Sequence, residues 1–192
     1  MPLIYFIRHG QTDWNAQRRL QGQRDIPLND TGRAQAARNG RKLGETVVHP
    51  DQFEFVASPL SRTRETMEIV RREMGLPLHG FRTDPILKEI NFGRWEGFTM
   101  DELSAEDPDA AKAHSADKWN SNAHGGESYA MLSQRAAEWL QSVDRDSIIV
   151  SHGAFSRCLR GLVLKLEQKE TIDLDVPQDS FFSIQQNQIN WH

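Results

Sequence analysis

The chain has 192 residues, of which 38% are hydrophobic and 26% charged, and its formal net charge is −4, as is typical of one globular domain. The acidic balance argues against a nucleic-acid partner, and without an apolar run of about 18 residues we expect no membrane-spanning helix. The single cysteine, Cys158, excludes an intramolecular disulfide, and the N-terminal apolar run is too short for a signal peptide, so we expect a cytoplasmic protein with one domain over residues 1–192.

The first predicted element is a short buried strand. The apolar residues Leu3 to Ile7 are followed directly by the turn Arg8-His9-Gly10. This pattern is typical of a buried strand that presents polar side chains at its carboxyl end. Ligands of open α/β sheets bind at that end of the strands, so we expect a functional site there.

The middle of the chain alternates helical and strand patterns. Residues 31–48 and 61–74 are predicted as helices, 53–57 and 78–83 as strands, and the Thr99-to-Glu102 capping box as the start of a short helix. Residues 104–126 are polar and low in aliphatic side chains. We interpret them as a helical lid with loops, inside a small insertion at about 98–127.

The last third continues the alternation. Residues 128–141 and 154–166 are predicted as helices, and 148–150, 181–184 and 188–191 as strands. Strands that alternate with helices predict a three-layer α/β/α sandwich with a mostly parallel central sheet. The strand at 148–150 also ends in a His-Gly pair, His152-Gly153. Two strands thus present one histidine each, which suits phosphoryl chemistry with a nucleophilic imidazole and fixed cationic groups.

Four separated sequence blocks resemble, in content and order, those of the histidine phosphatase superfamily, the phosphoglycerate-mutase-like enzymes. The blocks are Arg8–Thr12 with Asn15, Ser58–Thr63, Glu89 with Phe92–Gly97, and Ser151–Gly153. The resemblance spans residues 3 to about 160. It implies a phosphoglycerate-mutase-like fold and phosphoryl transfer through a phosphohistidine.

The resemblance also implies roles for individual residues. His9 would form the phosphohistidine, because a neutral imidazole has a lone pair available near pH 7. Arg8 and Arg62 would clamp the phosphate with planar guanidinium groups. His152 would bind the phosphate and stabilise charge in the transition state. Weaker correspondences assign substrate binding to Asn15, Gln21, Gly22 and the backbone amide of Gly153.

A proton donor for the leaving group is needed as well. The residues alone do not distinguish Glu89 from Glu96 or Glu102, but the family pattern places the acid before the Phe-Gly-x-Trp-Glu-Gly block and so selects Glu89. We expect no metal or cofactor, because the remaining histidines lack ligand spacing and Gly125-Gly126 lacks the rest of a P-loop. These histidines are His49, His79, His114, His124 and His192.

The most specific functional hypothesis is a metal-independent phosphomonoesterase that hydrolyses small phosphorylated metabolites, resembling the compact α-ribazole and broad-specificity phosphatases. Only 63 positions separate Glu89 from His152, which leaves room for a modest lid and an open site that admits water. A phosphoglycerate mutase and a non-catalytic phospholigand-binding protein remain alternatives. The natural substrate is not readable from the sequence, and the oligomeric state stays open, a homodimer included.

Overall fold

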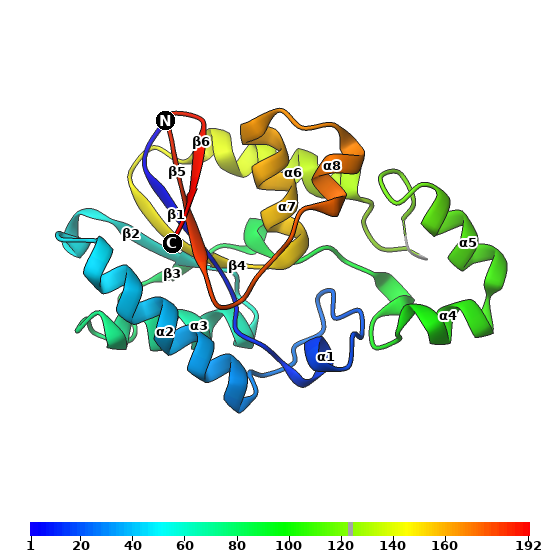
Figure 1. The fold of residues 1–192 in the computed structure, drawn as a ribbon, viewed down its shortest axis with the longest axis horizontal. Coiled ribbons are helices and arrows are strands. Elements are labelled where there is room, and N and C mark those ends of the chain that lie inside the picture. The colour runs from blue at the N-terminus through cyan, green and yellow to red at the C-terminus, as the bar shows by residue number, and fades with distance from the viewer. Residues whose placement is uncertain (123–124) are drawn as a thin grey trace.

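A six-stranded sheet in the order β3-β2-β4-β1-β5-β6 forms the centre of the molecule (Figure 1). The computed structural model describes residues 1–122 and 125–192. Strands β1 to β4 run parallel to one another, and β5 and β6 form a hairpin whose first strand is antiparallel to β1. The strands are β1 (Ile4–Arg8), β2 (Glu54–Ala57), β3 (Arg82–Thr83), β4 (Ser147–Ser151), β5 (Phe181–Gln185) and β6 (Gln188–Trp191).

Helices cover both faces of this sheet, which confirms the predicted three-layer α/β/α sandwich. Successive residues of β1 point to opposite faces. Tyr5 and Ile7 pack with the cluster that includes α2 (Asp30–Thr46) and α3 (Ser61–Glu73). Ile4 and Phe6 pack with the cluster that includes α6 (Tyr129–Ser142) and α7 (Gly153–Leu164). Two separate apolar layers therefore hold the sheet rigidly between helices.

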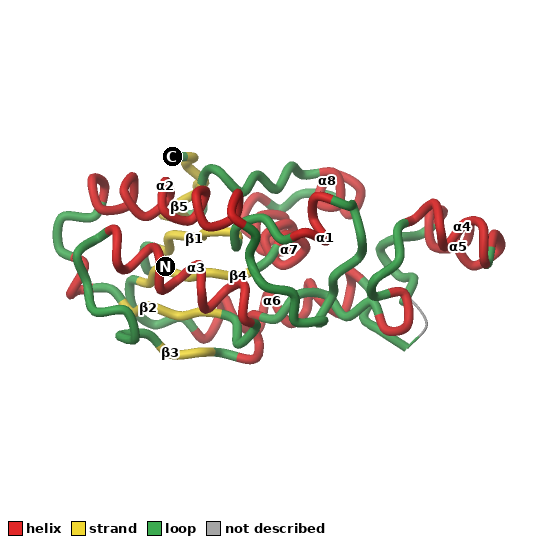
Figure 2. Tube along the Cα trace, turned by 90° about the horizontal axis from the view of Figure 1, so that it is seen from below, coloured by secondary structure: helices red, strands yellow, loops and turns green. Residues whose placement is uncertain are grey.

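The predicted lid region contains two helices, α4 (Met100–Glu106) and α5 (Pro108–Ala116), which lie at one end of the molecule, away from the strands (Figure 2). The predicted capping box is present, because the Thr99 side chain accepts from the amide of Glu102 and the Glu102 side chain accepts from that of Thr99. Residues 123–124 of the predicted insertion lie outside the described residues. No helix in the described part of the chain is both long and apolar enough to cross a membrane.

Some short elements differ from the sequence prediction. The strand expected at 78–83 is confined to Arg82 and Thr83, because the preceding residues form a turn in which the amide of Gly80 donates to the carbonyl of Pro77 at 3.4 Å. Two short helices were not predicted, α1 (Asp13–Ala16) and α8 (Gln168–Asp173). The remaining helical elements are the 3-10 turns Pro50–Gln52, Pro85–Leu87 and Gly93–Trp95.

Candidate active site

Strand register places the two His-Gly turns beside each other. In the parallel pairing of β1 with β4, Arg8 lies opposite Ser151, and each chain then continues into its histidine. The rings of His9 and His152 lie edge to face, with their centroids 5.1 Å apart. Both histidines follow the carboxyl ends of central strands, where open α/β sheets bind ligands.

The hydrogen bonds of His9 fix which nitrogen carries its lone pair. His9 is 2% exposed, and its Nδ1 lies 2.7 Å from the carbonyl oxygen of Gly10. A carbonyl can only accept, so Nδ1 carries the proton and Nε2 carries the lone pair. Burial, and next the cations of Arg62 and Arg8, lower the pKa of His9 well below 6.5. His9 is therefore neutral at pH 7, with a nucleophilic nitrogen available.

The backbone around His9 is held by several elements. The amide of Gly10 donates to Thr66 Oγ1 of α3 at 3.1 Å, and Gln178 Nε2 donates to the carbonyl of His9 at 3.0 Å. A β-carbon at Gly10 would lie 2.1 Å from the carbonyl oxygen of Gly32, so the close approach of this turn to α2 requires glycine. These contacts position the imidazole without using its Nε2.

Two arginines lie beside His9, Arg62 buried and Arg8 half-buried. Arg62, fully buried at the start of α3, donates from Nε to His9 Nε2 at 3.3 Å and from its terminal nitrogens to the carbonyls of Arg24 and Gly22 at 2.7 and 2.8 Å. Arg8 donates to the carbonyl of Val176. Burial lowers the pKa of each arginine to about 10, so both stay cationic at neutral pH. Their charge is oriented by carbonyl oxygens, which leaves it available to an anion.

Two buried side-chain nitrogens in the described part of the chain have no hydrogen-bond partner, Arg8 Nε and His152 Nδ1. An unsatisfied buried polar group costs about 1–3 kcal/mol. The other ring nitrogen of His152, Nε2, lies 2.8 Å from Ser58 Oγ. Burial, and next the charge of Arg62, lower the pKa of His152 well below 6.5. Arg8 Nε is a donor, and His152 Nδ1 is one when Ser58 donates to Nε2, so a bound oxyanion would satisfy both.

A cavity of about 150 Å³ opens onto His9, Arg8, Arg62 and Glu89. Its walls also include the four residues that the sequence assigns to substrate binding, Asn15, Gln21, Gly22 and Gly153. Thus eight of the nine predicted site residues line one cavity, although they come from segments spread over 145 positions of the chain. His152 lies against His9 rather than in the cavity wall.

The structure distinguishes the three candidate carboxylates, Glu89, Glu96 and Glu102, which the residues alone did not distinguish. Of the three, Glu89 lines the cavity, and its oxygens accept hydrogen bonds from the amides of Ile90, Ala154 and Phe155 at 3.0 to 3.3 Å. Glu96 accepts from the amides of Gln23 and Phe92, and Glu102 caps α4. Glu89 is thus the carboxylate of the three that lies at the cavity, where it contacts amides of the first turn of α7.

The loop that carries the weaker candidates is tied together by side chains. Asn15 Oδ1 accepts from the amide of Thr12 and from Gln178 Nε2, and Thr12 Oγ1 donates to Gln21 Oε1 at 2.9 Å. Gly22 has a positive φ of 51°, and a β-carbon there would lie 2.1 Å from Glu96 Oε1. The loop therefore needs glycine where its carbonyl turns to meet Arg62.

Several residues at or beside the site were not predicted to take part in it. Ser58 stands in one of the recognised blocks, but nothing in the sequence shows that it binds His152 Nε2. Gln178 supports both His9 and Asn15 from a loop near the end of the chain. Arg157 and Tyr129 line the cavity and are linked by a 3.3 Å hydrogen bond from Arg157 to the Tyr129 hydroxyl. No local sequence signal distinguishes these side chains from surface or core residues.

Within residues 1–122 and 125–192, no group of three or more His, Cys, Asp or Glu side chains is arranged to hold a metal ion. His124 lies outside the described residues. The single cysteine, Cys158, is buried in the apolar cluster over α7, and burial raises the pKa of its thiol to about 12. It is therefore a core residue rather than a nucleophile.

A family model described as the histidine phosphatase superfamily (branch 1) matches residues 4–192. A relative from Erwinia tasmaniensis named "Probable phosphoglycerate mutase GpmB" is 35% identical, and the match covers 100% of this chain and 88% of the relative. A protein of the same name from Escherichia fergusonii is 34% identical, with 86% of this chain and 76% of the relative covered.

Solved structures of phosphatases also match this chain over nearly its whole length. A mycobacterial glucosyl-3-phosphoglycerate phosphatase in complex with VO3 superposes with a TM-score of 0.78 at 28% identity, covering 100% of this chain and 97% of that one. A candidate α-ribazole-5′-phosphate phosphatase from Escherichia coli has the same fold, with a TM-score of 0.84 at 24% identity and 100% and 94% coverage. The match over nearly the whole chain shows that this protein belongs to the histidine phosphatase superfamily, which comprises phosphatases and phosphoglycerate mutases.

Proposed function

We propose that the protein is a phosphomonoesterase that hydrolyses small phosphorylated metabolites through a phosphohistidine at His9. The observation that carries this proposal is the neutral, buried His9, whose Nε2 lone pair faces the cationic guanidinium of Arg62. Arg8 supplies a second cation beside it, and both line the cavity. A nucleophile between two fixed cations suits a phosphate dianion.

In the first step, His9 Nε2 attacks phosphorus and the bond from phosphorus to the ester oxygen breaks. The phosphoryl group takes the place of the contact between Arg62 Nε and His9 Nε2. Glu89, in its protonated form, gives its proton to the leaving alkoxide, which departs as an alcohol. Arg8 and Arg62 stabilise the negative charge on the transferring oxygens, and His152 Nδ1 can donate to one of them.

In the second step, water attacks phosphorus and the phosphorus–nitrogen bond breaks. The Glu89 carboxylate takes the proton from the attacking water, so inorganic phosphate leaves, His9 is again neutral and Glu89 is again protonated. The guanidinium groups supply the charge stabilisation that a metal ion would otherwise provide, so we propose a metal-independent reaction without a cofactor.

Phosphoglycerate mutase activity is the second candidate. It is favoured by the two relatives named as probable phosphoglycerate mutases, at 34–35% identity. In a mutase, the phosphoryl group on His9 would pass to an acceptor hydroxyl instead of water. The short lid region favours hydrolysis, because a more open site admits water.

A product assay separates the two activities. The protein should release inorganic phosphate from p-nitrophenyl phosphate and from members of a panel of phosphorylated metabolites, with EDTA present throughout. If 3-phosphoglycerate plus 2,3-bisphosphoglycerate gives 2-phosphoglycerate without net phosphate release, the protein is a mutase instead. Loss of activity in EDTA that Mg²⁺ or Mn²⁺ restores would contradict the metal-independent mechanism.

The pH profile should report the lowered pKa of His9. A free imidazole begins to lose its nucleophilic lone pair as the pH falls through 6.5, but His9 should stay neutral to a lower pH because burial and two cations oppose its protonation. Lowering the pH protonates the nucleophile, so the acidic limb of kcat/KM should lie below pH 6.5. We would measure kcat/KM against pH and correct for the ionisation of the substrate. An enzyme group titrating at or above pH 6.5 on that limb would contradict the environment assigned to His9.

A further inference from the structure

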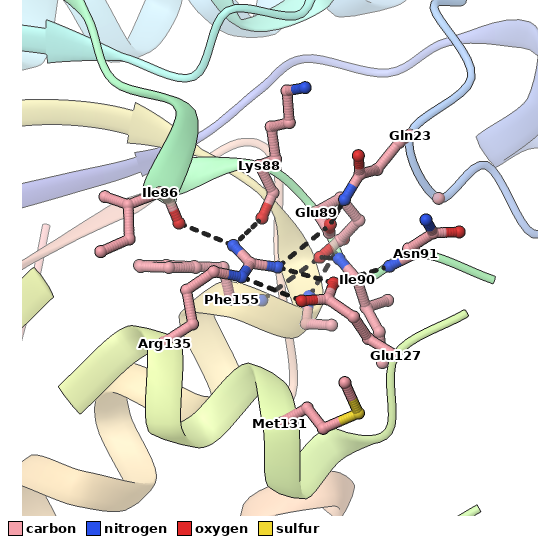
Figure 3. Close-up of polar contacts among 12 residues, drawn as sticks. Gln23, Ile86, Lys88, Glu89, Ile90, Asn91, Glu127, Met131, Arg135 and Phe155 are labelled. Atoms are coloured by element: carbon pink, nitrogen blue, oxygen red, sulfur yellow. Dashed lines mark hydrogen bonds and ion pairs between the residues drawn. The ribbon is translucent and has the colours of Figure 1, made fainter. Parts of the chain in front are cut away.

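Arg135, on α6, binds the backbone of the segment that carries Glu89 (Figure 3). Its Nη1 donates to the carbonyls of Ile86 and Lys88 at 2.6 and 2.7 Å, and its Nη2 donates to the carbonyl of Glu89 at 3.3 Å. Residues 88–92 belong to no helix or strand, so the carbonyls in this stretch lack the partners that regular structure supplies. One guanidinium group therefore binds three carbonyls of this segment, and Gln23 Nε2 also donates to that of Glu89 at 3.2 Å.

Glu127 fixes the orientation of that guanidinium group. It forms a two-pronged ion pair with Arg135, from Arg135 Nε to Oε1 at 3.0 Å and from Nη2 to Oε2 at 2.8 Å. The side chains of Arg135 and Glu127 are 18% and 19% exposed, so solvent screens the pair weakly. Planar two-pronged pairing is specific to arginine, because a lysine ammonium cannot reproduce the fork.

The pair also reaches the segment on the other side of Glu89. Glu127 accepts from the amide of Asn91 at 2.9 Å and donates its own amide to the carbonyl of Asn91 at 2.6 Å. The guanidinium of Arg135 lies over the ring of Phe155, 5.8 Å from its centroid, and the amide of Phe155 binds Glu89 Oε1. The same ion pair thus contacts backbone on both sides of Glu89 and the ring of a residue whose amide binds its carboxylate.

We propose that Arg135 and Glu127 are positioning residues that set the geometry of proton transfer by Glu89. Neither residue lines the cavity that contains His9, so they act through Glu89 rather than on the phosphate. The proposal rests on the proposed function, in which Glu89 protonates the leaving group. An acid displaced by a fraction of an ångström loses much of its effect on a poor leaving group and little on a good one.

The test compares Arg135→Lys with the wild type on an alkyl phosphate and on p-nitrophenyl phosphate. We expect kcat for the alkyl phosphate to fall about tenfold or more, which is part of the roughly 10²–10⁴-fold that a positioned acid contributes. In single-turnover measurements, which leave out the second step in which Glu89 also acts, release of p-nitrophenol should be slowed much less, and the substrate concentration that half-saturates each reaction should change little. Glu127→Gln, which keeps an oxygen for the amide of Asn91 but loses the ion pair, should show the same pattern and serves if Arg135→Lys does not fold.

Arg71→Lys is the matched control. Arg71 also donates to a backbone carbonyl, that of Pro77, and lies over the ring of Phe55, but it packs away from the cavity. It should leave the ratio of the two activities unchanged. If it shifts this ratio as Arg135→Lys does, the effect is a general one on the fold and the proposal is wrong.

A double variant separates this proposal from the proposed function. In a Glu89→Gln background, Arg135→Lys should cause little further loss, because the group through which it acts has gone. Full additive loss, or equal loss on both substrates, would overturn the positioning role. If Glu89→Gln alone shows no dependence on the leaving group, the failure lies in the assignment of the acid, and the positioning role falls with it.

Discussion

His9→Ala is expected to abolish phosphatase activity, with kcat reduced by roughly 10³-fold or more. His9 lines the cavity, its imidazole is neutral at pH 7, and its Nε2 lone pair points at the guanidinium group of Arg62. Removing it leaves Arg8 and Arg62 able to bind a phosphate but takes away the atom that attacks phosphorus. Steady-state kinetics with p-nitrophenyl phosphate would measure the loss.

The control for this variant is a histidine outside the cavity. His192 stacks on Phe181 and contacts Ser183 Oγ of β5, and it does not line the cavity, so His192→Ala should keep its activity. Circular dichroism and thermal unfolding would show whether His9→Ala is folded. A folded His9→Ala protein that keeps more than a few per cent of the wild-type rate would mean that another group is the nucleophile.

Glu89→Gln should have the second largest effect, and its size should depend on the substrate. On an alkyl phosphate, whose alkoxide needs a proton in order to leave, we expect kcat to fall by roughly 10²–10⁴-fold. On p-nitrophenyl phosphate, whose leaving group is stable as an anion, the first step should be slowed much less. Single-turnover measurements of leaving-group release from the two esters would test this.

The comparison of two leaving groups guards against a purely structural explanation. Glu89 accepts hydrogen bonds from the amides of Ala154 and Phe155, and the amide nitrogen of a glutamine cannot accept them. Any resulting disturbance of α7 would slow both substrates. Equal losses on both substrates would therefore assign Glu89 to the support of α7 or of the phosphate site instead of to proton transfer.

The parts of the fold that the sequence predicts are those encoded locally. The apolar run before Arg8 and the capping box at Thr99 each mark an element in a few neighbouring residues, and each is present in the structure. The two short unpredicted helices also begin with capping boxes, at Thr12 and Glu167. With four and six residues, they are too short to show an apolar periodicity.

The side chains that hold the site residues in place could not be predicted from the local sequence, because they act through contacts between residues far apart in the chain. Gln178 reaches His9 across 169 positions, and Ser58 meets His152 across 94. Arg135 lies at helical spacing from the buried Leu132 and Trp139, but its spacing does not show that it binds carbonyls nearly 50 positions away. The chemical groups of the site were recognised from motifs, but the packing that orients them follows from the three-dimensional arrangement of the sheet and its helices.

The central claim is that a covalent phosphohistidine forms at His9, and rapid quenching during turnover tests it most directly. The enzyme would be mixed with a ³²P-labelled ester, quenched in alkali, which preserves a phosphorus–nitrogen bond, and digested for mass spectrometry. The mechanism predicts a phosphoryl group on the peptide that contains His9, bound to Nε2, and its disappearance in His9→Ala. A phosphoryl group on any other residue would contradict the mechanism.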